Sequence, residues 1–118
     1  MSSDDLNSIS STLKEQLRAD IISSSDTGAN KTFLKNIVQD DFPDVDKRII
    51  YKLINEMIIT GELFYDERGF VKASCFYPNT AIGIYEAKRQ PVPQLVVDYW
   101  EKKNNRKYTG KIRSNENA

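Results

Sequence analysis

The stretch from Val45 to Ser74 constrains the fold more than any other part of the chain. Its first half carries apolar residues at helical spacing, namely Ile49, Ile50, Leu53, Ile54, Met57 and Ile58. This spacing predicts an amphipathic helix whose apolar stripe faces a core. Asp44 precedes it as a candidate cap, and Asp46 adds a negative charge at the positive end of the helix dipole. Gly61 favours the left-handed turn that ends a helix.

The second half of the stretch has the pattern of a β-hairpin. Residues 63–65 and 70–73 have the composition of short strands, and Asp-Glu-Arg-Gly at 66–69 has that of a turn. Gly69 supplies the residue with positive φ that such a turn usually needs. The sequence therefore predicts a helix that runs directly into a hairpin.

Two further helices are predicted upstream. Residues 1–5 are polar, and we expect them to be disordered. A helix over 6–23 follows from the spacing of Leu6, Ile9, Leu13, Leu17, Ile21 and Ile22. Thr32 is a candidate cap for a short helix over 33–40, whose inner face would be Phe33, Leu34, Ile37 and Val38.

Phe42-Pro43 ends this short helix, because proline cannot continue it. Only a few residues then separate it from the next helix. Two helices joined by a short turn, with a hairpin after the second, are the arrangement of a winged helix-turn-helix. We therefore expect an α+β fold with a winged-helix domain over residues 6–78.

The chain beyond this domain divides into three parts. Residues 79–93 read as a loop, then a short strand or an ordered strap, and finally a stiff proline-containing connector. Residues 94–101 read as a short C-terminal helix. Residues 102–118 are rich in lysine, arginine and asparagine, which predicts a flexible basic tail.

Composition narrows the function classes. The 17 basic residues balance 17 acidic ones, although residues 79–118 hold eight basic against four acidic. The chain has no histidine and one cysteine, Cys75, which removes histidine-based catalysis and zinc sites and fits a reducing compartment. It shows no phosphate-binding loop, nucleophile elbow or apolar run long enough to span a membrane. We expect a non-enzyme with no metal, cofactor or membrane partner.

Residues 13–74 resemble eukaryotic winged-helix domains. The likeness is carried by Leu13, Leu17 and Ile21, by Phe33-Leu34 with Ile37-Val38, and by the 49–58 helix. Gly-Glu-Leu-Phe-Tyr at 61–65 with Phe-Val-Lys at 70–72 resembles the wings of two domains, the C-terminal domain of replication protein A's middle subunit and minichromosome maintenance helicase C-terminal domains. Residues 34–43 are similar to the second helix of linker histones. The resemblance implies a winged-helix fold in a class where some members bind duplex DNA and others bind only proteins.

Three groups of residues are candidates for nucleic-acid binding. The outward face of the 49–58 helix carries Lys47, Arg48, Tyr51, Lys52 and Asn55, which in a DNA-reading helix would contact phosphates and base edges in the major groove. On the hairpin, Arg68 and Lys72 could reach the minor groove or the backbone. The tail offers Lys102, Lys103, Arg106 and Lys107. The alternative in each case is a solvated surface, and neighbouring acids such as Asp46 and Glu56 oppose phosphate binding.

Two aromatic groups are also open to alternatives. Leu95, Val96, Tyr99 and Trp100 form either a helix that packs on the core or a docking helix for a protein partner. Tyr65, Phe70, Phe76 and Tyr77 are either core packing or a platform for stacked bases, and core packing is favoured. Three functions follow: a nuclear protein that binds duplex DNA, a protein-binding subunit of a chromatin, transcription or replication complex, or a bridging homodimer.

Overall fold

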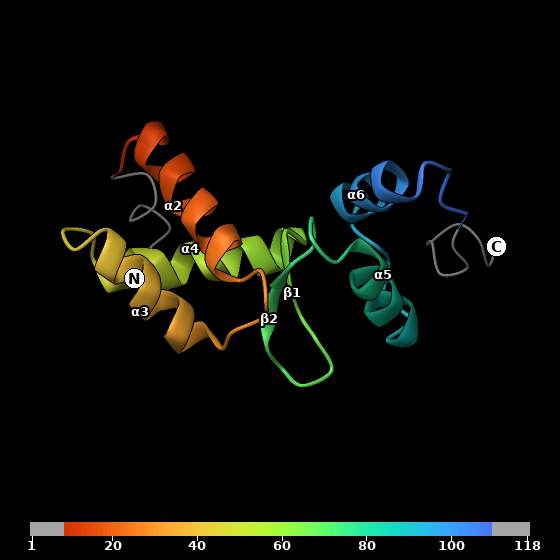
Figure 1. Cartoon of the computed structure of the whole chain (residues 1–118), viewed down its shortest axis with the longest axis horizontal. Helices are drawn as coiled ribbons and strands as arrows, with labels where there is room; N and C mark the ends of the chain where they lie inside the picture. Colours follow the sequence, from red (N-terminus) through yellow and green to blue (C-terminus); the bar gives the residue numbers. More distant parts are fainter. Residues whose placement is uncertain (1–8, 110–118) are drawn as a thin grey trace.

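The computed structural model describes residues 9–109, which form five helices and one antiparallel hairpin (Figure 1). The elements are α2 Ser11–Ser24, α3 Lys31–Asp41, α4 Lys47–Thr60, β1 Leu63–Tyr65, β2 Val71–Ala73, α5 Pro78–Ala87 and α6 Gln94–Asn104. The molecule is elongated, 48 × 28 × 24 Å, with α2–α4 at one end, α5 and α6 at the other, and the hairpin between them (Figure 1). This α+β arrangement is compatible with a helix-turn-helix followed by a wing.

Helix α2 begins later than predicted. Ser10 has extended backbone and its hydroxyl accepts a hydrogen bond from the Leu13 amide at 3.0 Å, so the first helical residue is Ser11. Leu17 and Ile21 are buried as the spacing predicts. The predicted start at Leu6 and the predicted disorder of residues 1–5 lie outside the described residues.

The caps of the next two helices also differ from the prediction. Asn30, not Thr32, caps α3 by accepting from the Phe33 amide at 2.7 Å. Asp46, not Asp44, caps α4 by accepting from the Arg48 amide at 2.9 Å. In both cases the competing polar residue lies two positions away, and the residue with extended backbone takes the role.

The inner face of α3 is narrower than predicted. Leu34 and Val38 are fully buried, Ile37 is partly buried, and Phe33 is 55% exposed. Phe33 precedes Leu34 by one residue, about 100° around the helix, which carries its ring away from the buried stripe.

The hairpin forms where the sequence predicts it, with Leu63 opposite Ala73 and Tyr65 opposite Val71. Helix α4 enters it through Gly61, whose φ is 95°. In the turn, a carboxylate oxygen of Asp66 accepts from the amides of Arg68 and Phe70 at 2.8 and 2.9 Å. Phe70 belongs to the turn and not to the strand, so β2 begins one residue later than expected.

An isolated β-bridge places a third backbone segment beside the hairpin, and no pattern in the sequence indicated this pairing. Ala29, just before α3, exchanges two backbone hydrogen bonds with Val71, at 3.0 and 2.7 Å. The bridge anchors the start of α3 against β2 and leaves β1 at the outer edge of the sheet.

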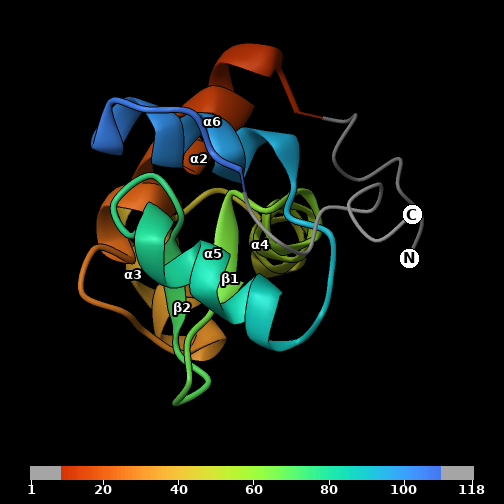
Figure 2. The ribbon, with the colours of Figure 1, turned by 90° about the vertical axis from the view of Figure 1, so that its right-hand side faces the viewer.

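The hairpin separates two hydrophobic cores. Side chains alternate across a strand, so Leu63 points into the core of α2, α3 and α4, and Phe64 points into a second core. The second core contains Ala81 and Ile82 of α5, Val96 and Val97 of α6, and Tyr108. Seen from the α5 side, α5 lies across the hairpin with α6 above it (Figure 2).

The C-terminal part is more regular than predicted. The expected strand or strap is a helix, α5, because Pro78 occupies its first turn, where a missing amide hydrogen costs nothing. Helix α6 extends to Asn104, three residues beyond the predicted end. Tyr108 is 8% exposed, so residues 102–109 belong to the folded unit, and the predicted flexibility of 110–118 lies outside the described residues.

One carboxyl group sits unfavourably between α2 and α3. An oxygen of Asp20 is buried without a hydrogen-bond partner among residues 9–109. This burial, together with the neighbouring carboxylate of Asp41, raises the pKa of Asp20 to about 6. A proton on Asp20 relieves both effects, because it removes the buried charge and supplies a donor toward Asp41.

Replacing Asp20 by asparagine should stabilise the fold at neutral pH. An aspartate in the unfolded chain releases its proton near pH 4, whereas folded Asp20 keeps its proton up to about pH 6. Stability should therefore fall as pH rises through that window and stay lower above it. Urea unfolding across pH about 4–7 should show this loss of stability in the wild type and no such loss in Asp20→Asn. The control variant Asp40→Asn, changed at an exposed position, should lose stability as the wild type does. An unchanged pH dependence in Asp20→Asn would contradict this account.

Replacing glycine by alanine should change the stability of the fold in opposite directions at Gly61 and Gly83. At Gly61 a Cβ would lie 2.8 Å from the Pro93 ring on a backbone of positive φ, so Gly61→Ala should destabilise by more than about 1 kcal/mol. At Gly83, inside α5, a Cβ meets nothing within 4 Å, so Gly83→Ala should stabilise by about 0.5–1 kcal/mol. Urea unfolding of both variants measures this, and a neutral Gly61→Ala would be the contrary result.

Candidate nucleic-acid interface

The residues predicted on the outward side of α4 do share one side of that helix. Lys47, Arg48 and Asn55 are exposed, and Tyr51 and Lys52 are partly buried. Lys47, Tyr51 and Asn55 recur every four residues, so they form one stripe along the helix.

Helix α3 adds two lysines to this stripe that sequence reasoning missed. The Lys31 ammonium donates to the Asn55 side-chain oxygen at 2.7 Å, and the Lys35 ammonium lies 5.9 Å from the centre of the Tyr51 ring. The two lysines are four residues apart, and this spacing was the available signal, but their proximity to α4 depends on how the helices pack. We call the combined surface the α3–α4 face: Lys31, Lys35, Lys47, Arg48, Tyr51, Lys52 and Asn55.

Three of these cations form no ion pair in the part of the chain that the structure describes, although the charge of Lys47 acts on the neighbouring Asp46. None of Lys31, Lys35 and Lys47 forms an ion pair within the described range. Arg48 differs, because its guanidinium contacts the Asp46 carboxylate at 2.7 Å. The hydrogen bonds from Arg48 lower the pKa of Asp46 to about 2. Arg48 is therefore partly neutralised by the residue that caps its own helix.

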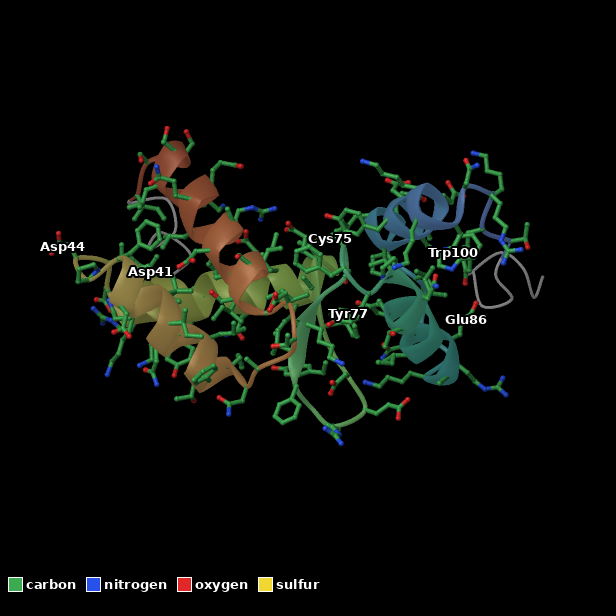
Figure 3. The ribbon with its side chains drawn as sticks, in the orientation of Figure 1. Asp41, Asp44, Cys75, Tyr77, Glu86 and Trp100 are labelled. Atoms are coloured by element: carbon green, nitrogen blue, oxygen red, sulfur yellow. The ribbon has the colours of Figure 1, made fainter. Side chains whose placement is uncertain are left out.

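The acids around this face lie at its margins. Asp41 and Asp44 occupy the end of α3 and the turn, at the extremity of the molecule far from Trp100 (Figure 3). Glu56 pairs with Lys14 of α2 at 3.5 Å. Lys31 and Lys35 therefore lie beside Asn55 and Tyr51, away from these acids, whereas Lys47 begins α4 directly after Asp46. An anionic ligand on this face would meet lysines that form no ion pair among residues 9–109.

The two hairpin candidates have different surroundings. Arg68 is exposed at the tip of the turn. The Lys72 ammonium lies 3.1 Å from an Asp66 carboxylate oxygen and 4.9 Å from the centre of the Tyr77 ring. Lys72 consequently ties the second strand to the turn and to the start of α5, and only Arg68 keeps its charge at the surface.

The C-terminal basic residues lie at the other end of the molecule from the amino end of α4 (Figure 1). Lys102 and Lys103 form the last turn of α6, where positive charge complements the helix dipole. The Arg106 guanidinium lies 5.2 Å from the centre of the Trp100 ring, and Lys107 is exposed. The structure does not bring this group together with the α3–α4 face.

The proposed docking helix packs within the protein. Val96 is fully buried, and Leu95, Tyr99 and Trp100 are partly buried. The Trp100 ring meets Tyr108 edge to face at 5.4 Å between centroids. The Tyr108 amide donates to Glu101 at 2.9 Å, and its hydroxyl donates to Glu86 of α5. Trp100 and Glu86 lie together at the α5–α6 end of the molecule (Figure 3).

The four aromatic residues considered as a stacking platform do not form one. Tyr65, Phe70 and Phe76 are 37%, 39% and 46% exposed, but no two of the four rings contact each other in the part of the chain that the structure describes. The Tyr77 hydroxyl donates to the Asp26 carbonyl, which ties the start of α5 to the loop before α3.

Residues 9–109 contain no group of three or more potential metal ligands, and no helix in that range is long and apolar enough to cross a membrane. Burial raises the pKa of the Cys75 thiol, which makes it a weak nucleophile. Comparison with protein-family models, curated proteins and solved structures finds no match for the chain.

Removing the Trp100 ring should destabilise the fold. Its packing on Tyr108 closes the second core, so Trp100→Ala should lower the free energy of unfolding by about 2 kcal/mol or more. Phe33→Ala, which removes an aromatic ring that is 55% exposed, is the control and should change stability by less than about 0.5 kcal/mol. Equal thermal stability of Trp100→Ala and the wild type would instead favour a docking role for Trp100.

Proposed function

We propose that the protein is a winged helix-turn-helix that binds duplex DNA through its α3–α4 face. The order of α2, the Ala29 bridge, α3, α4 and the β1–β2 hairpin supports the fold assignment, because this is how such domains place a second helix and a wing on a three-helix body. Helix α4 would enter the major groove, and the turn that carries Arg68 would approach the DNA backbone or minor groove.

One observation carries the proposal. Lys31, Lys35 and Lys47 lie along the stripe of Tyr51 and Asn55 and form no ion pair among residues 9–109. Phosphate contacts supply most of the affinity of proteins for DNA, so lysines that need not leave a carboxylate bind phosphate at the least cost. Asn55 is the candidate base-reading residue among them, since asparagine can pair with adenine once its side-chain oxygen is released from the Lys31 ammonium.

Charge reversal on the α3–α4 face should weaken duplex binding and reduce its dependence on salt. In Lys35→Glu/Lys47→Glu both changes lie at exposed or partly exposed positions, so the fold should persist. We expect affinity for a random duplex to fall at least about tenfold, and the slope of log affinity against log salt to become shallower by about two, as two phosphate contacts disappear. Fluorescence anisotropy at about 50 and 200 mM salt measures both quantities.

The matched control is Lys102→Glu/Lys103→Glu, which makes the same change in net charge on α6. It should retain most of the affinity if the α3–α4 face binds DNA. Equal losses in the two double variants, or wild-type binding that does not respond to salt, would contradict the proposal.

Duplex length tests whether the C-terminal basic residues take part. The molecule is 48 Å long, which corresponds to about 14 base pairs at about 3.4 Å each. If Lys102 and its neighbours also touched the duplex, binding would tighten and the salt slope would steepen between duplexes shorter and longer than this. We expect no such change, since the structure places the two basic groups at opposite ends.

A further inference from the structure

Strand β1 has an unpaired outer edge. In this antiparallel ladder Asp66 bonds to Phe70 and Ser74 bonds to Glu62, so Phe64 bonds to Lys72 between them. The N–H and C=O groups of Leu63 and Tyr65 therefore point away from β2. Leu63 is fully buried, whereas Tyr65 is 37% exposed, and no backbone partner for Tyr65 occurs among residues 9–109. On the opposite edge of the sheet, the equivalent groups of Val71 are already paired with Ala29.

A groove follows this edge. It consists of two cavities of about 490 and 660 Å³, both lined by Tyr65, Ile84 and Lys88. One wall is the end of α4, where Ile58 is partly buried and Ile59 is 82% exposed. The other wall is the side of α5 that carries Thr80, Gly83, Ile84 and Ala87, followed by Lys88 just after the helix. The small residues of this stripe leave room beside the strand.

The first cavity has one charged side chain. Lys88 is the only ionisable cation or acid among its lining residues, and it forms no ion pair within the described part of the chain. Tyr85 also lines it, three residues earlier on α5, and its hydroxyl has no hydrogen-bond partner among the described residues. The cavity thus offers apolar walls formed by Ile59 and Ile84, and two donors suited to one carboxylate.

We propose that this groove binds an extended peptide segment of a partner protein, which adds to β1 as a further strand. The peptide backbone pairs with the N–H and C=O groups of Tyr65. An apolar side chain of the peptide lies between Ile59 and Ile84, and a carboxylate of the peptide meets Lys88 and Tyr85. A lipid would leave the strand edge unpaired. A phosphate backbone is unsuited to the apolar walls and to Asp66 and Glu67, which line the second cavity. The combination of edge, apolar walls and Lys88 in the first cavity therefore fits a peptide.

The test uses selection from a phage library of random peptides of about ten residues on the immobilised full-length chain, followed by anisotropy titration of the enriched peptides. We expect enrichment of sequences that join an apolar residue to an acidic one. Gly83→Gln should weaken their binding at least about tenfold, because its side chain occupies the groove, while the open space at this position and the good helix propensity of glutamine preserve the fold.

Charge reversal tests the proposed contact between Lys88 and the peptide carboxylate. Lys88→Glu should abolish binding, and peptides in which the acidic residue is replaced by lysine should bind that variant. Lys102→Glu, which changes the same charge on α6 away from the groove, should bind like the wild type. Duplex binding should survive Gly83→Gln and Lys88→Glu, so this proposal and the proposed DNA binding fail separately.

Three results would overturn the proposal. They are a library that yields no enriched peptide, enriched peptides whose binding is insensitive to both groove variants, and self-association of the wild type by light scattering that either variant abolishes. The last result would assign the groove to a second copy of this chain.

Discussion

The rest of the structure depends on the way β1 is shared between two cores. The left-handed turn at Gly61 directs the chain from α4 into β1. The buried hydroxyl of Ser74, the residue after β2, donates to the Gly61 carbonyl and closes the open end of the hairpin. From there Leu63 enters the core of α2–α4, and Phe64 enters the core of α5 and α6. One short strand therefore sets how both halves of the molecule lie relative to each other, and it also determines that α4 and α5 flank a groove along its open edge.

A chain with balanced charge can still present lysines without ion pairs on one face, because several of its acids are engaged elsewhere. Asp46 caps α4 and holds Arg48, Asp66 organises the hairpin turn and holds Lys72, and Glu62 pairs with Arg18. Glu56 is neutralised in the same way by Lys14. These acids thus stabilise caps, turns and contacts between elements, whereas Lys31, Lys35 and Lys47 form no ion pair within the described range. The net charge of zero is for this reason a poor guide to the local electrostatics.

The sequence predicted the α4–hairpin unit well, because local signals there agree: helical spacing of apolar residues, then Gly61, then a turn with Gly69. The predicted N-caps of α3 and α4 each lie two residues from the observed ones. For α3, Asn30 and Thr32 are both residue types that cap helices, and the choice depends on the pairing of Ala29 with β2. Helix α5 was missed because Ile82, Gly83 and Ile84 have the pattern of a strand. The helix is favoured by Pro78 in its first turn and by the burial of Ala81 and Ile82 against α6. Lys31 and Lys35 were missed as members of the face because their proximity to α4 is a tertiary contact.

The most direct test of the central claim is an NMR titration of the isotope-labelled full-length chain with a short duplex. Binding through the α3–α4 face predicts the largest shifts at Lys31, Lys35, Tyr51 and Asn55, with smaller ones near Arg68 and almost none on α6. Shifts confined to α5 and α6, or spread evenly over the surface, would contradict it.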